Sequence, residues 1–486
     1  MKREIKILIF SFLALFMASF FAGSFAHGLT LEEYLAQVQS KNKNFRSFEA
    51  STSAAEDRFA TADLDLSPAL TLKGSYLDDK SLVIYGPGIE VTRNQMTTYS
   101  AELSKKFSSG TTAAVSTGVQ GVVTDATGFG SGAPIETYSG FAQVSLTQSL
   151  WKDFFGHATR LRWERESALR TQEKQGYNLQ AKQTLIEAES AYWDLIYAEE
   201  DIKIREAGLT RAQAILQWVQ RRYGNGIGDK ADVLNAQGLA QARELELLNA
   251  KDDLRTAQQK VADELEIKNL NELPDLQGSL GNSRSIKGYV NPSTASDRIV
   301  KLDAYLAILD AKAKAVAANE SQDSLKPDLV LQGSYKTNGY DDNLNGSWAK
   351  ATDTGHPTLN VGVQFRWLLD WETKGAVRNA AKMDALSASL KQERQLLESD
   401  SDWSELLRKN DELSKKIVVA QKISDTQTAH AAAERQKLSK GRAITSDVIT
   451  AEQDADEAAL TLTKLKTEQR KLESQGRLFV AIGDGV

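Results

Sequence analysis

The chain has 486 residues, of which 41% are hydrophobic and 26% are charged, and its formal net charge is -6 at pH 7. This acidic balance provides no basic surface for phosphate backbones, so nucleic acid is excluded as an expected partner. Because the chain contains no cysteine, a disulfide framework, a thiolate metal site and a catalytic thiol are excluded as well.

Residues 1–26 have the pattern of a secretory signal peptide. Lys2 and Arg3 precede an apolar run over residues 7–21, and residues 24–26 (Ser-Phe-Ala) have the small-x-small form of a signal-peptidase site. We therefore expect an exported mature protein that begins near His27. An uncleaved N-terminal anchor is the alternative, although the apolar run is short for a membrane span.

Residues 30–67 predict the first helix. Thr30 and Glu33 have the spacing of a capping box, and apolar residues recur at helical intervals until Pro68. From about 68 to 151 the helical period disappears, and four segments alternate polar and apolar residues between Gly-, Ser- and Asn-rich breaks. These segments are predicted to be strands with two different faces, which suit either a soluble sandwich or a membrane barrel.

Residues from about 157 to 270 predict a long helical hairpin. A polar helix without proline extends to Arg222, and a glycine-rich turn then reverses the chain. The return helix has a coiled-coil seam of small apolar residues at intervals of seven. The members of the seam are Val233, Ala240, Leu247, Leu254 and Val261, with Ala236, Ala250 and Ala257 as the companion row.

Residues 271–293 form a turn-rich connection, after which residues 294–486 repeat the plan of residues 27–270. We expect a helix to about 325, strands between about 327 and 369, and a hairpin over about 375–482 that turns at Gly441. The second seam consists of Val448, Ala455 and Leu462, with Ala451, Ala458, Leu465, Leu472 and Phe479 as its companion row.

Two motifs occur once in each half of the chain. Residues 68–76 (PALTLKGSY) return as residues 327–335 (PDLVLQGSY), and residues 223–237 return as residues 438–452. Such a duplication indicates pseudo-equivalent halves that share a ring. The first half also contains an extra hairpin's worth of strand sequence between Tyr76 and Gly140, which has no counterpart in the second half.

The residues that usually carry chemistry are scattered. The four histidines, His27, His157, His356 and His430, lie far apart without the spacing of a metal site. The glycine-rich segments lack the strand-then-helix context of a phosphate loop. We therefore expect neither an enzyme nor a bound cofactor.

The order and duplication of the motifs resemble the TolC-like outer-membrane channel family of Gram-negative bacteria. The matching features are a signal followed by LTLEEYLAQVQS, the strand L-x-L-x-G-S-Y in each half, VSLTQSLWKDFFG before the long helix, and G-x5-D-V at both turns. The resemblance implies an α+β membrane protein and a homotrimer. Strands from three chains close one β-barrel in outer-membrane lipid, and a periplasmic α-helical barrel continues it.

The resemblance also implies a function. A channel of this kind conducts substrates passively in efflux or type I secretion, together with a periplasmic adaptor (membrane fusion) protein and an inner-membrane pump of RND or ABC type. It catalyses no reaction and needs no cofactor. The alternative function is a non-channel exported coiled-coil protein with a β head, such as an adhesin. Aromatic residues near the strand ends favour the barrel.

The hairpin turns are the candidate functional site. If several turns meet at one end of a ring, Asp229, Asp232 and Asp447 surround a negative entrance that favours cations. Helix capping is the alternative role of these carboxylates. The resemblance adds Tyr223, Leu438 and Arg442 to the periplasmic entrance. It assigns adaptor docking to the turn glycines Gly224, Gly226, Gly228 and Gly441.

Some features depart from the family pattern. Family members often have Tyr three residues before the turn glycine, as at Tyr223, but the second half has Leu438. An arginine that helps to close the entrance in some members corresponds to Ala443, next to Arg442. The closing contacts are therefore expected to differ. The extra strand hairpin leaves two alternatives open, an enlarged barrel or an extracellular flap.

Overall fold

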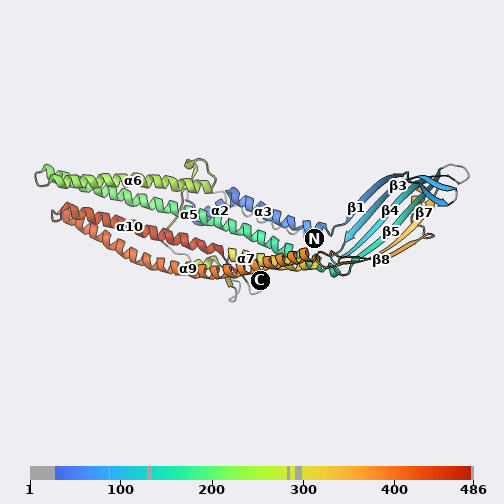
Figure 1. The fold of residues 1–486 in the computed structure, drawn as a ribbon. Coiled ribbons are helices and arrows are strands. Elements are labelled where there is room, and N and C mark those ends of the chain that lie inside the picture. Colours follow the sequence, from blue (N-terminus) through green and yellow to red (C-terminus); the bar gives the residue numbers. More distant parts are fainter. Residues whose placement is uncertain (1–27, 87, 128–133, 282–284, 291–297, 483–486) are drawn as a thin grey trace, which may run out of the picture. The chain divides into compact units, whose positions relative to one another are not determined.

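The computed structural model describes residues 28–86, 88–127, 134–281, 285–290 and 298–482. The expected signal peptide, residues 1–26, lies outside these ranges. The chain divides into two compact units, each of which takes segments from both sequence repeats (Figure 1). Unit 1 consists of Met1–Glu49, Asn178–Leu302 and Glu398–Val486, and unit 2 consists of Ala50–Tyr177 and Asp303–Leu397.

Unit 2 contains one seven-stranded antiparallel sheet (Figure 1). Its neighbouring strands, in order, are β1 (Ala69–Asp79), β3 (Ile89–Lys106), β4 (Thr111–Thr127), β5 (Ile135–Ser149), β7 (Asp328–Asp341) and β8 (Thr358–Arg366), and the short β2 (Val83–Gly86) pairs with β3. The four strands expected between residues 68 and 151 are confirmed. The strand sequence without a counterpart in the second half lies within the sheet, because β3 and β4 separate β1 from β5.

At the end of the sheet where β1 begins, one face is apolar and the opposite face is polar, as strand alternation predicts. One row across the six long strands is entirely apolar, and its side chains are between 45% and 73% exposed: Leu70, Leu103, Val115, Val144, Tyr335 and Leu359. The adjacent row points to the opposite face and is entirely polar: Thr71, Glu102, Ser116, Gln143, Lys336 and Thr358. The exposed apolar face therefore needs a non-aqueous covering.

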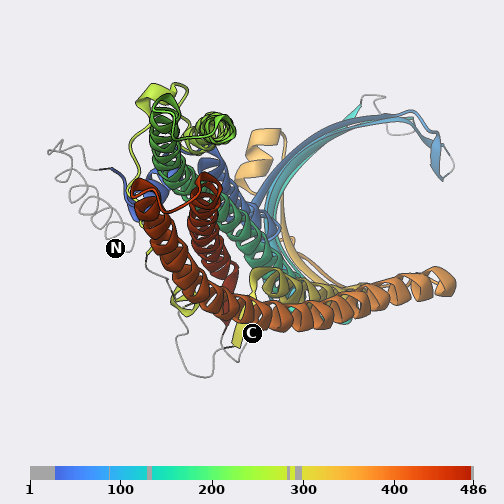
Figure 2. The same ribbon diagram turned by 90° about the vertical axis from the view of Figure 1, so that its left-hand side faces the viewer.

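The apolar face is the convex one. Figure 2 shows the sheet as a curved arc, with the short helix α8 (Leu344–Ala349) outside it. Helix α8 packs where glycines leave room, since a Cβ atom at Gly140 would lie 2.2 Å from the carbonyl oxygen of Ser347. The indole N–H of Trp348 donates to the hydroxyl oxygen of Thr117 over 3.2 Å. Thr117 and Gly140 belong to the apolar face, so the polar face lines the concave side.

A tight corner joins the sheet to the long helix α5 (His157–Gly224) through the 3-10 turn η2 (Phe154–Gly156). The Asp153 carboxylate accepts hydrogen bonds from the backbone N–H of Thr159 at 3.0 Å and from its hydroxyl at 2.9 Å. The turn between β3 and β4 packs against this corner: a Cβ atom at Gly156 would lie 1.7 Å from the carbonyl oxygen of Ser108. The turn between the inserted strands β3 and β4 is thus fixed at the corner where the sheet meets α5.

Unit 2 also contains α4 (Thr61–Leu64), most of α3 (Lys43–Phe59) and of α7 (Leu302–Ser324), and the first parts of α5 and α9 (Trp371–Ser439). Ion pairs join these helices. Arg165 pairs with Glu320 at 2.5 Å, and Arg58 pairs with Glu173 at 3.0 Å. Within the described ranges, no helix is long and apolar enough to cross a membrane.

Unit 1 contains two helical hairpins, α5 with α6 (Lys230–Glu264) and α9 with α10 (Thr445–Ser474). The predicted seams are buried, and their small residues allow the helices to approach closely. The buried members are Ala236, Ala240, Leu247, Ala250, Ala257 and Val261 in α6, and Val448, Ala451, Ala455 and Leu462 in α10. Short 3-10 turns complete the unit: η3 (Leu270–Glu272), η4 (Ile286–Tyr289) and η5 (Gln475–Leu478).

The prediction of one uninterrupted first helix is wrong. The capping box of Thr30 and Glu33 is confirmed at the start of α2 (Leu31–Lys41), but Asn42 has an extended backbone and ends that helix. The Asn42 side chain accepts a hydrogen bond from the N–H of Asn44 at 2.9 Å and donates to the carbonyl oxygen of Glu264 at 3.2 Å. It therefore starts α3 and binds the end of α6 at the same time.

Two segments that were predicted to be helical form a small sheet. Strand β6 (Arg298–Lys301) pairs with β9 (Phe479–Ile482), so the helix expected from about residue 294 begins at Leu302 in the described chain. Phe479 belongs to β9 and not to the α10 seam. Its ring is buried against Ile286 and Val290, and this tertiary packing outweighs the helical spacing of the sequence.

We expect Gly156→Ala to disrupt the corner. Gly156 has a φ of 78°, and the added methyl group would overlap the Ser108 carbonyl, so the cost should exceed about 2 kcal/mol. Thermal unfolding followed by tryptophan fluorescence should show a lower transition temperature. Gly333→Ala is the matched control, because no atom lies within 4 Å of its added Cβ. Equal transition temperatures for the two variants would contradict the proposed packing of the corner.

Candidate functional site

Both hairpins of unit 1 end in the same backbone turn. Gly226 and Gly441 have left-handed φ values of 75° and 69°. The N–H of Gly226 donates to the carbonyl of Tyr223 at 2.9 Å, and that of Gly441 donates to the carbonyl of Leu438 at 2.8 Å. The next N–H group in each turn, that of Ile227 or Arg442, reaches back five residues. This helix C-terminus favours glycine, which explains why glycine recurs in both copies of the motif.

The three predicted carboxylates lie at helix starts. Asp229 is the N-cap of α6, and its carboxylate accepts a hydrogen bond from the N–H of Ala231 at 3.0 Å. Asp232 and Asp447 lie in the first turns of α6 and α10, where the helix dipole favours negative charge. In the described chain neither of these two side chains has an ion-pair partner, and Asp447 is exposed. Asp229 therefore has a capping role, whereas Asp447 remains available to solvent.

The two copies differ most at Tyr223 and Leu438. The Tyr223 side chain is 48% exposed, whereas Leu438 is 4% exposed. Leu438 packs in a cluster that contains Val219 of α5, Leu239 of α6 and Val448 of α10. The Leu438 side chain thus lies between the two hairpins and does not reach solvent. Of the other predicted positions, Gly224 and Arg442 are exposed, and Gly228 is half-buried with its backbone close to Tyr223.

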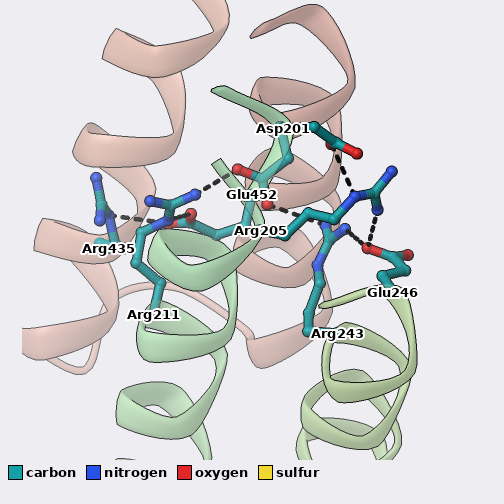
Figure 3. Close-up of polar contacts among 8 residues, drawn as sticks. Asp201, Arg205, Arg211, Arg243, Glu246, Arg435 and Glu452 are labelled. Carbon is teal, nitrogen blue, oxygen red and sulfur yellow. Dashed lines mark hydrogen bonds and ion pairs between the residues drawn. The ribbon is translucent and has the colours of Figure 1, made fainter. Parts of the chain in front are cut away.

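A cluster of eight charged residues links all four hairpin helices (Figure 3). We call it the hairpin ion network. Its members are Asp201, Arg205 and Arg211 of α5, Arg243 and Glu246 of α6, Arg435 of α9, and Glu452 and Asp456 of α10.

Arg211 connects the first hairpin to the second. Its Nε donates to the Oε2 of Glu452 at 2.7 Å, and its Nη2 binds the carboxylate of Asp456. The other oxygen of Glu452 forms an ion pair with the Nε of Arg435 at 2.8 Å. Helices α5, α9 and α10 are therefore joined through one buried glutamate.

Arg243 extends the network to α6. Its Nη2 lies 3.2 Å from the Oδ2 of Asp456, and its Nη1 donates to Glu246 at 2.7 Å. Glu246 in turn accepts a hydrogen bond from Arg205 at 3.2 Å. The Asp456 carboxylate occupies the space above Gly208, where an added Cβ atom would lie 2.8 Å from Oδ2. Because Gly208 has no side chain, it leaves room for the Asp456 carboxylate that binds Arg211 and Arg243.

Burial makes this network sensitive to the loss of any one member. Glu452 and Asp456 are 4% and 6% exposed, and buried carboxylates are costly unless they are paired. Burial raises the pKa of the Asp456 carboxyl, against the opposing charges of Arg211 and Arg243. Burial also raises the pKa of Asp201, against the charge of Arg205. Asp456 therefore takes up a proton more readily than an exposed aspartate.

The sequence interpretation missed the hairpin ion network. A signal was present, because Glu452 and Asp456 are four residues apart on α10 and each directly follows a seam residue, Ala451 or Ala455. Like charges at this spacing repel each other unless cations face them. The cations come from three other helices, and sequence spacing alone does not identify them. In the described part of the chain, no group of three or more His, Cys, Asp or Glu side chains is arranged to hold a metal ion.

We expect mild acid to loosen the contact between the hairpins. Because burial raises the pKa of Asp456, its ion pairs with Arg211 and Arg243 should weaken as the pH falls, at a higher pH than an exposed aspartate would require for protonation. Protonation of Asp456 should not itself lower the free energy of unfolding. A carboxyl group whose pKa is raised in the folded state binds a proton more readily there than in the unfolded state. The measurement is hydrogen exchange over residues 431–456, corrected for intrinsic rates.

Asp456→Asn should raise the rate of hydrogen exchange over residues 431–456 at neutral pH. The difference in exchange rate between this variant and the unmodified protein should shrink in acid. The matched control is Asp454→Asn, which removes an exposed charge from the same helix. Indistinguishable exchange in the two variants would show that the network does not couple the hairpins.

The comparisons with known proteins agree with this fold. Residues 132–263 match the family described as outer membrane efflux protein. This match covers the end of the strand region, helix α5 and almost all of α6. No curated protein has a significantly similar sequence.

Solved outer-membrane channels share the fold over most of the chain. The outer-membrane channel OprN is 16% identical, with a TM-score of 0.63 over 92% of this chain and 89% of its own. The outer membrane protein VceC from Vibrio cholerae is 15% identical, with a TM-score of 0.64 over 92% and 95%. The open state of the MtrE outer membrane channel of Neisseria gonorrhoeae is 14% identical, with a TM-score of 0.62 over 92% and 88%.

The resemblance inferred from the duplicated motifs is therefore confirmed. The chain has the fold of the outer-membrane channels, and over residues 132–263 it carries the sequence pattern of the outer membrane efflux protein family.

Proposed function

We propose that the protein is the outer-membrane channel subunit of a tripartite efflux or type I secretion system. In this proposal, three copies close a β-barrel in the outer membrane, and their helices continue it into the periplasm. The observation that carries the proposal is the two-faced sheet in a chain with the outer-membrane channel fold. Its convex face is apolar and exposed, and its concave face is polar, as a water-filled barrel in lipid requires.

Exposed aromatic residues at one end of the sheet support a membrane interface there. The rings of Trp151, Phe365, Trp367 and Trp371 form a chain of contacts, with successive centroids 6.5, 6.4 and 4.8 Å apart. All four side chains are between 39% and 62% exposed. Aromatic girdles of this kind lie at the headgroup level of membrane barrels. These residues adjoin the ends of β5 and β8 that lead into α5 and α9, so we assign this interface to the periplasmic side.

The hairpin turns are the proposed docking site for the periplasmic adaptor, which connects the channel to an inner-membrane pump of RND or ABC type. Each turn exposes an isoleucine: Ile227 is 66% exposed and Ile444 is 64% exposed. An exposed isoleucine within three residues of the turn glycine gives each tip a small apolar contact surrounded by polar residues. Small apolar contacts with a polar rim are typical of protein interfaces.

The entrance is proposed to be closed by contacts between the hairpins and to be negative at its mouth. The hairpin ion network and the cluster around Leu438 hold the hairpins together. Asp232 and Asp447, without ion-pair partners in the described chain, contribute carboxylates near the turns. In a trimer, six turns repeat this charge around one axis, which favours cations.

A non-channel exported coiled-coil protein with a β head, such as an adhesin, remains the second candidate. The buried seams fit that protein equally well. The exposed apolar row on the convex face does not, because a soluble β head would leave this face in water.

The first test is reconstitution of the purified mature protein. We expect a trimer that needs detergent and that forms ion-conducting pores in planar bilayers, because the apolar face requires lipid or detergent as its covering. A water-soluble monomer that conducts no current would overturn the channel proposal in favour of the second candidate.

The second test concerns the entrance. Replacement of both Asp232 and Asp447 by Ala should reduce the preference for cations over anions, measured as the reversal potential in a salt gradient across a bilayer. Asp229→Asn is the control for capping, since an asparagine retains the N-cap acceptor. If the double variant keeps its reversal potential, these carboxylates act only on the helix dipoles.

A further inference from the structure

We propose that the transmembrane barrel has eighteen strands, six from each of three chains, and that β1 of one chain pairs with β8 of the next. This inference rests on the proposed trimeric channel function and adds the construction and width of its membrane section. Four strands per chain would give twelve.

The two edges of the sheet determine which partner completes it. In the described chain, β1 and β8 each have a neighbour on one side only, so their outer N–H and C=O groups are unpaired. Such groups cost several kcal/mol each in a membrane, so open sheet edges do not face lipid. A second copy of the chain presents the complementary edge. With six long antiparallel strands, β1 and β8 run in opposite directions, and they have similar lengths of 11 and 9 residues.

The register within one chain has the stagger that a closed barrel requires. The row that starts at Ala69, the first residue of β1, reaches β8 at Asn360. Asn360 lies six residues before the end of β8 at Arg366 (366 − 360). If Ala69 of one chain pairs with Arg366 of the next, this offset of about 20 Å along the strands is spread over six spacings, or about 29 Å, per chain. The resulting tilt is about 35°, at the lower end of the range of about 35–45° found in barrels.

The same alignment matches the faces of the two edge strands. With Ala69 opposite Arg366, Thr71 lies opposite Gln364 and Leu72 lies opposite Val363. Polar side chains then meet on the concave side, and apolar side chains meet on the convex side. A shift by one residue would place every β1 side chain on the wrong face relative to β8.

The inserted strands therefore set the width of the pore. Barrel diameter grows roughly in proportion to strand number, so eighteen strands give a barrel about half as wide again as twelve. Barrels of about sixteen to eighteen strands leave an aqueous channel through the middle. We infer that the membrane section does not limit the size of the cargo, and that the limit lies at the hairpin turns.

Cysteine cross-linking tests the edge pairing in the full chain, which has no cysteine of its own. Thr71→Cys combined with Gln364→Cys should give a covalent trimer on oxidation, because both side chains face the water-filled side. Thr71→Cys combined with Val363→Cys is the matched control, since these two side chains point to opposite faces. Covalent trimers are expected from the first pair only.

A deletion tests the width directly. The registers place Asp79 opposite Ile135 once β3 and β4 are removed, because Asp79 pairs with Asn94, Asn94 with Thr124, and Thr124 with Ile135. Replacement of residues 80–134 by Asn-Gly should therefore join β1 to β5 by a two-residue hairpin turn. Electron cryomicroscopy of the full-length trimer and of the deletion trimer should show that the deletion reduces the barrel diameter to about two thirds.

The possible results separate this proposal from the channel function. Conducting trimers without the Thr71–Gln364 cross-link, or with a full-length barrel of twelve strands, would overturn the eighteen-strand barrel and leave the channel function intact. A full-length protein that forms neither trimers nor pores would overturn both. If the deletion variant does not fold, cross-linking and the strand count of the full-length barrel still decide the question.

Discussion

Backbone hydrogen bonding at the two edges of the sheet is the constraint on which the rest of the structure depends. An open sheet with an apolar convex face and a polar concave face is unstable both in water and in lipid. Water leaves the apolar row uncovered, and lipid leaves the edge N–H and C=O groups unpaired. In the proposed trimer, other copies of the chain supply the missing neighbours, so the strands themselves favour this assembly.

The inserted strands β3 and β4 illustrate how a barrel can change its size without changing its construction. Two antiparallel strands preserve the direction of the chain and the alternation of the faces, so β5 keeps the orientation it would have beside β1. The turn of the insertion is held at the corner of Gly156 and Ser108, where β5 passes into α5. A pair of strands is therefore the smallest addition that this sheet accommodates.

The hairpins satisfy a different constraint, which is the burial of charge. The seams contain small apolar residues, and the contact between hairpins combines the Leu438 cluster with the hairpin ion network. Glu452 and Asp456 each contact two arginines, and the two arginines come from different helices. Such a contact is specific in geometry and sensitive to protonation, two properties that suit the proposed role of the hairpins as an entrance that opens and closes.

The sequence by itself determined the elements whose signals are local. Strand alternation, the capping box at Thr30, the seams of seven apart from Phe479, and the two turn glycines were predicted correctly, because each depends on residues close together in the chain. The family resemblance followed from the same local motifs and their duplication.

Only the tertiary structure decided the features that depend on distant residues. The end of α2 at Asn42 depends on a carbonyl of Glu264, and the strand at Phe479 depends on packing against Ile286. The hairpin ion network joins residues as far apart as Arg211 and Asp456, and the place of β3 and β4 in the sheet depends on β5 beyond them. Hydrogen bonds, ion pairs and packing between distant segments leave no periodic trace in the sequence, so the structure had to supply them.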